Sequence, residues 1–111
     1  MSNNFTALGR LAKDPELKTV GDSQVLEFRL ASDVGFGERK STNWLNCAIW
    51  GKRAESLKEH LSKGSQVVVY GVLTLREWED KEQNKRLSPD VRVNELSFAG
   101  SKPDSEGGEP F

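Results

Sequence analysis

Apolar residues alternate with polar ones along most of the chain, and this period of two restricts the fold more than any other feature. Between Trp44 and Trp50, the apolar residues Leu45, Cys47 and Ile49 alternate with a second set of side chains. Successive side chains of a β-strand point to opposite faces, so this pattern indicates a strand with Leu45, Cys47 and Ile49 toward the core. The alternation predicts an all-β protein.

Four further segments have β-strand character, and one segment has helical spacing. The other predicted strands are Phe5–Leu11, a row of Leu26, Phe28 and Leu30, a row of Val67, Val69, Leu73 and Leu75, and Val91–Phe98. Within Lys52–Lys63, apolar residues recur at helical intervals, and Gly64 follows where a helix C-cap favours positive φ. Three strands, a helix and two strands in about 100 residues is the order of a five-stranded Greek-key OB-fold barrel, with one α-helix between strands 3 and 4. A small β-sandwich is the alternative.

The chain has 111 residues, which is enough for one domain with one core. We expect this domain to occupy residues 1–100 and a short, flexible acidic tail to occupy residues 101–111, where Pro, Gly and acidic residues prevail. The alternative for the tail is an idle, frayed end. The net charge is −1 and the pI about 5.9, without the basic excess usual in nucleic-acid binders, although residues 1–100 carry fifteen cations against fourteen carboxylates.

Several classes of function lack the residues that they need. Cys47 is the single cysteine and His60 the single histidine, so neither a disulfide nor a zinc site of soft ligands is expected. The segment Gly35-Phe36-Gly37 lacks the remainder of a nucleotide-binding loop. We therefore expect no enzyme, no catalytic residue, no metal and no cofactor. No apolar run approaches the roughly 20 residues of a membrane span, and no secretory leader is visible, so a cytoplasmic protein is expected.

Four aromatic residues are predicted to lie outside the hydrophobic core. Strand parity sends Trp44 and Trp50 to the outer face, and it places Trp78 on an outward row with Arg76. Phe36 is predicted in a loop close to cations. Exposed rings near positive charges suit single-stranded nucleic acid, because every base offers a π-face for stacking. Any one of these rings could instead cover a barrel end or a subunit interface, but four together favour base stacking.

The candidate phosphate contacts are the cations near these aromatic residues. Acids such as Glu77 and Glu82 reduce the positive charge of the same region, and the alternative is that this charged run is simply a solvated surface. These candidates are Lys18, Arg39, Lys40, Lys52, Arg76, Lys81, Lys85 and Arg86.

The order and spacing of several short motifs resemble those of the bacterial-type single-stranded DNA-binding protein (SSB) family. The motifs are Gly9-Arg10-Leu11 with Asp14-Pro15-Glu16-Leu17, Phe28-Arg29-Leu30-Ala31, Trp50-Gly51-Lys52 with Ala54-Glu55, Lys63–Val69 and Leu73–Trp78. The resemblance implies an OB barrel that wraps single-stranded DNA, usually as a homotetramer. Its base-stacking positions fall on Phe36, Trp44, Trp50 and Trp78, and its phosphate contacts on Lys18, Arg39, Lys52, Lys63 and Arg76. The segment Glu79–Leu87 would be the hairpin that closes over the strand.

The resemblance also implies two protein interfaces. Gln66, Val68 and Tyr70 share the outer face of one strand and would lie in a subunit interface, the alternative being cover by the protein's own helix. The tail residues that resemble the family's partner-docking peptide are Asp104, Glu106, Glu109, Pro110 and Phe111, which would recruit DNA-maintenance proteins.

The function expected from these features is sequence-nonspecific binding and protection of single-stranded DNA in replication, recombination and repair, which implies that the cytoplasmic protein is nucleoid-associated. Two alternatives remain open: an OB-fold replication adaptor that mainly binds proteins, and an RNA-binding barrel of the cold-shock kind.

Overall fold

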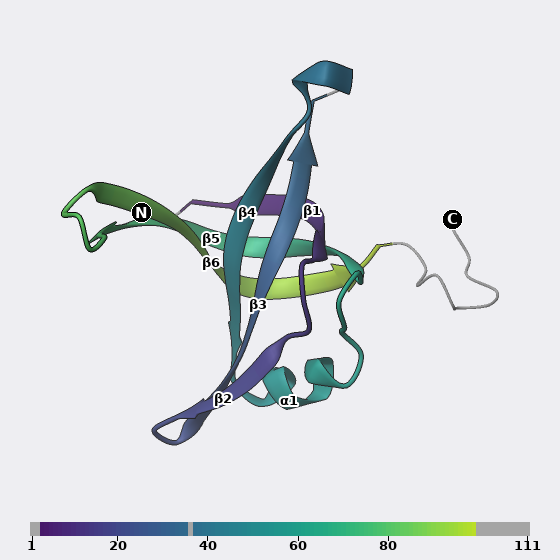
Figure 1. The fold of residues 1–111 in the computed structure, drawn as a ribbon. Helices are drawn as coiled ribbons and strands as arrows, with labels where there is room; N and C mark the ends of the chain where they lie inside the picture. The colour runs from purple at the N-terminus through teal and green to yellow at the C-terminus, as the bar shows by residue number, and fades with distance from the viewer. Residues whose placement is uncertain (1–2, 36, 100–111) are drawn as a thin grey trace.

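The computed structural model describes residues 3–35 and 37–99, which form a closed β-sheet with one helix at its end (Figure 1). The strands are β1 (Phe5–Leu11), β2 (Glu16–Val20), β3 (Ser23–Val34), β4 (Ser41–Trp50), β5 (Gln66–Glu79) and β6 (Lys85–Phe98). A 3₁₀ turn, η1 (Gly37–Arg39), follows β3, and helix α1 (Lys52–Lys58) follows β4. Within these described residues, no helix is long and apolar enough to cross a membrane.

The sheet closes into a barrel through β1. The strand order is β1-β5-β6-β4-β3-β2, and β1 pairs with β3 as well as with β5. In the closing pairs, Arg10 lies opposite Ala31 and Leu11 opposite Leu30. A Cβ atom on Gly9 would lie 2.5 Å from the carbonyl oxygen of Ala31, so this close approach of β1 to β3 requires glycine.

The core consists of the inward-facing residues that the period of two predicts. Leu45, Cys47 and Ile49 of β4 are buried, and Leu26, Phe28 and Leu30 of β3 pack against the same cluster. The predicted arrangement of these two strands is confirmed. Eight large side chains in the described part are almost fully enclosed: Leu11, Leu26, Leu30, Ile49, Val25, Val67, Val69 and Val91.

A β-bulge lets both halves of β6 face the core. Tyr70 lies opposite Glu95 and Gly71 opposite Val93, so Asn94 is the extra residue. Val93 before the bulge and Leu96 after it therefore both point inward, although they are three residues apart. The Arg53 guanidinium of α1 donates a hydrogen bond to the Asn94 carbonyl, which ties the helix to the bulge.

Three details differ from the sequence prediction. There are six strands in the described part rather than five, because Glu16–Val20 pairs along its whole length with β3. The helix is shorter than Lys52–Lys63, since it ends at Lys58. Gly64 does have positive φ, at 90°, but it lies in the turn that precedes β5 and does not cap the helix.

The far halves of the β3–β4 and β5–β6 hairpins project beyond the barrel (Figure 1). The strand parity that predicts Trp78 to point outward also predicts Leu75 to point toward the core, and this part of the prediction is wrong: the Leu75 side chain is 55% exposed, because the sheet beyond Leu73 has no second layer over it.

Candidate nucleic-acid interface

The strand register aligns outward-facing residues of four strands in one cross-strand row. Asn46 of β4 lies opposite Arg29 of β3 and opposite Asp90 of β6, and Asp90 lies opposite Thr74 of β5. Residues directly opposite one another project from the same face of a sheet. This row therefore crosses the middle of a continuous outer face, which we call the β4–β6 face.

All three indoles belong to the β4–β6 face. Trp44 and Trp50 share parity with Asn46 on β4, and Trp78 shares parity with Thr74 on β5. Their side chains are 45%, 41% and 45% exposed, respectively. The prediction that these rings stand outward is confirmed, whereas Phe36, the fourth predicted stacking residue, lies outside the described residues.

An open groove of about 650 Å³ runs along the β4–β6 face. Its lining includes Asn46 and Ala48, which separate Trp44 from Trp50 on β4, and Arg76, which precedes Trp78 by two residues on β5. The indoles themselves are not among the described residues that line the groove, but residues next to them on β4 and β5 are.

The groove lining contains equal numbers of positively and negatively charged side chains. The cations are Lys13, Arg29, Arg76 and Arg92, and the acids are Asp14, Glu16, Glu27 and Asp90. The Arg29 guanidinium lies 5.1 Å from the centroid of the Trp44 ring, a cation–π contact on the margin of the groove.

Asp90 is the most highly bonded acid in this groove. Burial raises the pKa of its carboxyl, but hydrogen bonds from Arg76, Ser88 and Asn46 together outweigh that effect, so its pKa lies below the ordinary value. The carboxylate is therefore charged at neutral pH.

Cys47 borders the same groove from the core side. Burial raises the pKa of its thiol to about 12, so the thiol stays protonated at neutral pH and is a poor nucleophile.

The model of the single-strand binding protein family matches residues 2–99. This chain belongs to the single-strand binding protein family. It is 33% identical to the single-stranded DNA-binding protein 1 of Chlorobaculum tepidum, over 96% of this chain and 69% of that protein. It is 34% identical to single-stranded DNA-binding protein 1 of Synechocystis sp., over 93% and 88% of the two chains.

Among solved structures, the barrel is similar to a small single-stranded DNA-binding protein from Streptomyces coelicolor. The TM-score is 0.77 at 21% identity, and the match covers 88% of this chain and 94% of the other. At 21% identity the similarity shows the fold alone, and it confirms the predicted OB-fold barrel.

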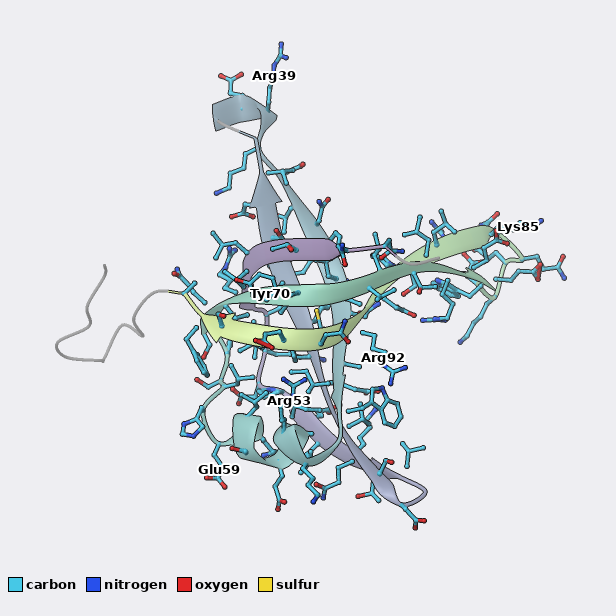
Figure 2. The ribbon with its side chains drawn as sticks, turned by 180° about the vertical axis from the view of Figure 1, so that it is seen from behind. Arg39, Arg53, Glu59, Tyr70, Lys85 and Arg92 are labelled. Atoms are coloured by element: carbon cyan, nitrogen blue, oxygen red, sulfur yellow. The ribbon has the colours of Figure 1, made fainter. Side chains whose placement is uncertain are left out.

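The structure does not gather the predicted phosphate contacts of this SSB-family chain into one patch. Of the nine, only Arg76 lines the groove. Arg39 and Lys85 lie at the ends of the β3–β4 and β5–β6 hairpins (Figure 2). Lys52 begins α1, Lys63 lies in the turn before β5, and Lys81 lies in the turn between β5 and β6.

Four of the predicted contacts are already paired with carboxylates. The ion pairs are Lys18–Glu27 at 2.8 Å, Lys40–Asp33 at 3.3 Å, Arg76–Asp90 at 2.8 Å and Arg86–Asp80 at 3.1 Å. A phosphate that binds one of these cations must compete with a carboxylate for it.

Three groove cations were missed by the sequence prediction: Lys13, Arg29 and Arg92. Strand parity could have found two of them. Arg29 alternates with Phe28 and Leu30, and Arg92 lies between Val91 and Val93, so each must point outward from a strand whose neighbours are buried.

A second outer face is apolar and lies on β1 and β5. Leu8 is opposite Val68, and these outward side chains continue along β5 to Tyr70, while Gln66 is exposed at the start of the strand. Leu8 is 59% and Tyr70 38% exposed. The alternative that the protein's own helix covers this face is wrong, because α1 packs against β2, β3 and β4, and Tyr70 lies on the sheet surface away from α1 (Figure 2).

Proposed function

We propose that this chain binds single-stranded DNA without sequence preference, by stacking bases on Trp44, Trp50 and Trp78 while cations around the groove contact phosphates. The observation that carries the proposal is the placement of three indoles, each between 41% and 45% exposed, on one outer face. Each stacked base contributes about 1–3 kcal/mol. The description of the family and the names of the relatives support the same ligand.

The form of the interface favours unpaired strands of any sequence. The flat faces of bases are hidden in a duplex, whereas they are free for stacking in a single strand. Every base has such a face, so stacking does not distinguish between sequences. The proposed role is stoichiometric rather than catalytic: protection of exposed strands in the cytoplasm during replication, recombination and repair.

The protein interfaces predicted from the sequence are part of this proposal. The chain would assemble as a homo-oligomer, a tetramer by resemblance to the family, through the outer face of β1 and β5. The predicted docking residues Asp104, Glu106, Glu109, Pro110 and Phe111 lie outside the described residues, and recruitment of DNA-maintenance proteins by them remains a proposal.

A fluorescence titration tests the DNA-binding proposal. The intrinsic tryptophan emission is followed while oligo-dT, oligo-U or a duplex of equal length is added at two salt concentrations. Oligo-dT should quench the emission more than duplex does, and affinity should fall as salt rises. Little quenching by any nucleic acid would favour the replication adaptor, and a preference for oligo-U would favour the RNA-binding barrel.

A further inference from the structure

Asp90 occupies the middle of the β4–β6 face. It lies on β6, opposite Asn46 of β4 and opposite Thr74 of β5, and it lines the groove. Its side chain is 35% exposed, so it remains open to a ligand in the groove. A strand that passes between the three indoles therefore meets a negative charge.

Three side chains hold this carboxylate in place. Its Oδ2 atom accepts a hydrogen bond from Arg76 Nε at 2.8 Å. Its Oδ1 atom accepts one from Ser88 Oγ at 2.9 Å and one from Asn46 Nδ2 at 3.3 Å. Asn46 Nδ2 also donates to Ser88 Oγ at 2.8 Å, so the donors form one connected network. The carboxylate thus binds the cation that a DNA phosphate would otherwise bind.

This pairing changes what Arg76 can contribute to DNA binding. A basic side chain favours association because it replaces the counterions at a DNA phosphate and releases them, and the number of such contacts sets the salt dependence. The charge of Arg76 is already balanced by Asp90 in the free protein. A phosphate at Arg76 must either displace the carboxylate or approach it closely, and both alternatives oppose binding.

We propose that Asp90 is an internal competitor of the DNA phosphate: it holds Arg76 in the free protein, and it thereby lowers both the affinity for single-stranded DNA and the salt dependence of binding. The inference rests on the proposed function, since it concerns the same groove. It assigns to Asp90 a role in tuning the affinity of the groove.

The first test replaces the charge and keeps the shape. Asp90→Asn should raise the affinity for oligo-dT at low salt about 3- to 10-fold, as expected for removal of one partly screened charge. It should also steepen the slope of log affinity against log salt by about 0.7, the value for one additional phosphate contact with a single strand. Thermal unfolding of both proteins shows whether the variant retains the fold.

The matched control is Glu59→Gln. This substitution changes the net charge by the same amount, but Glu59 is exposed at the end of α1, away from the groove-lining Arg92 (Figure 2). Affinity and slope should stay close to those of the unchanged protein. If Asp90→Asn binds no more tightly than Glu59→Gln, the inference is wrong.

A double-mutant cycle with Arg76→Gln supplies an independent test. The loss of affinity and the decrease in slope caused by Arg76→Gln should be several-fold larger in the Asp90→Asn background, where Arg76 is free for phosphate. Equal losses in both backgrounds would also overturn the inference. Failure of the unchanged protein to bind oligo-dT would instead overturn the proposed function.

Discussion

At the scale of single residues, Trp44 illustrates how the barrel presents a ring for stacking. The indole is 45% exposed, and the Arg29 guanidinium lies 5.1 Å from its centroid. An exposed cation–π contact of this kind stabilises by about 0.5–1 kcal/mol, which is less than a stacked base contributes. Arg29 can therefore orient the ring in the free protein and give way to a base when DNA binds.

We expect Trp44→Ala to weaken binding of oligo-dT by about 5- to 150-fold, which corresponds to the loss of one stacked base worth about 1–3 kcal/mol. Trp44→Phe is the matched control, and it should retain most of the affinity because it keeps a π-face. Because the side chain is half exposed, neither change should lower the free energy of unfolding by more than about 1 kcal/mol. Equal affinities of the alanine and phenylalanine variants would contradict stacking at this position.

Strand parity was sufficient to predict the outward direction of the indoles, but it could not predict the ion pairs. Parity is a property of a single strand, so a strand that directs Leu45 toward the core directs Trp44 outward wherever the strand lies in the sheet. The pair Arg76–Asp90 depends on the register that places Asp90 opposite Thr74, and register is set by turns and bulges elsewhere in the sheet.

At the scale of elements, the β5–β6 hairpin depends on Asp80 for the shape of its turn. The Asp80 Oδ1 atom accepts hydrogen bonds from the backbone N–H groups of Glu82 and Asn84, each at 2.9 Å. Its Oδ2 atom accepts one from Arg86 Nε at 3.1 Å. Gln83 has a φ of 66°, in the left-handed region, and the Asp80 carboxylate bridges this strained part of the turn.

The turn should be sensitive to acid. The Asn84 hydrogen bond, with smaller contributions from Arg86 and Glu82, holds the pKa of Asp80 below its ordinary value of 3.8. A carboxyl with a lowered pKa in the folded state stabilises that state above its unfolded pKa, and this stabilisation is lost as the pH falls through the folded pKa. We expect the Glu82 and Asn84 amides to exchange faster with solvent as the pH falls below about 4, relative to the rates in an unfolded chain.

Amide exchange followed by NMR measures this effect, and two variants control it. Asp80→Ala should remove the protection of both amides at neutral pH, and Asp80→Asn should keep part of it because the amide oxygen still accepts. Core amides of β4 should be unaffected in both variants. Protection that persists in Asp80→Ala would show that the backbone of the hairpin holds the turn without the carboxylate.

The errors in predicting the elements have a common physical cause. Strand β2 contributes only Leu17 to the core, so its sequence lacks the alternation that revealed the other strands. Helix α1 was predicted to extend too far because Leu61 continues its apolar spacing, yet Leu61 is buried from the irregular segment after the helix. Leu75 has core parity but lies beyond the barrel end. Periodicity reports which way a side chain points, and tertiary structure decides what covers it.

At the scale of the whole molecule, closure of the barrel leaves a broad apolar surface on β1 and β5 exposed within the described part of the chain. Strand β1 pairs with β5 on one side and meets β3 on the other, so the inner faces of these strands are enclosed. Their outer side carries Leu8, Val68 and Tyr70, of which Leu8 is 59% exposed. A contiguous patch of exposed apolar side chains on a sheet favours association with a second protein surface.

We expect the unchanged protein to be an oligomer, whose mass in solution is a multiple of the 12.4 kDa of one chain. Tyr70→Asp should shift this mass toward that of the monomer. In a symmetric interface each patch faces another copy of itself, so the substitution brings two carboxylates into an apolar contact, where burial of unpaired charge is costly. Val20→Asp is the control, because Val20 is a 52%-exposed apolar residue beside the β2–β3 turn. Light scattering coupled to gel filtration gives the masses. A monomeric unchanged protein, or equal masses for both variants, would show that the β1–β5 surface does not mediate assembly.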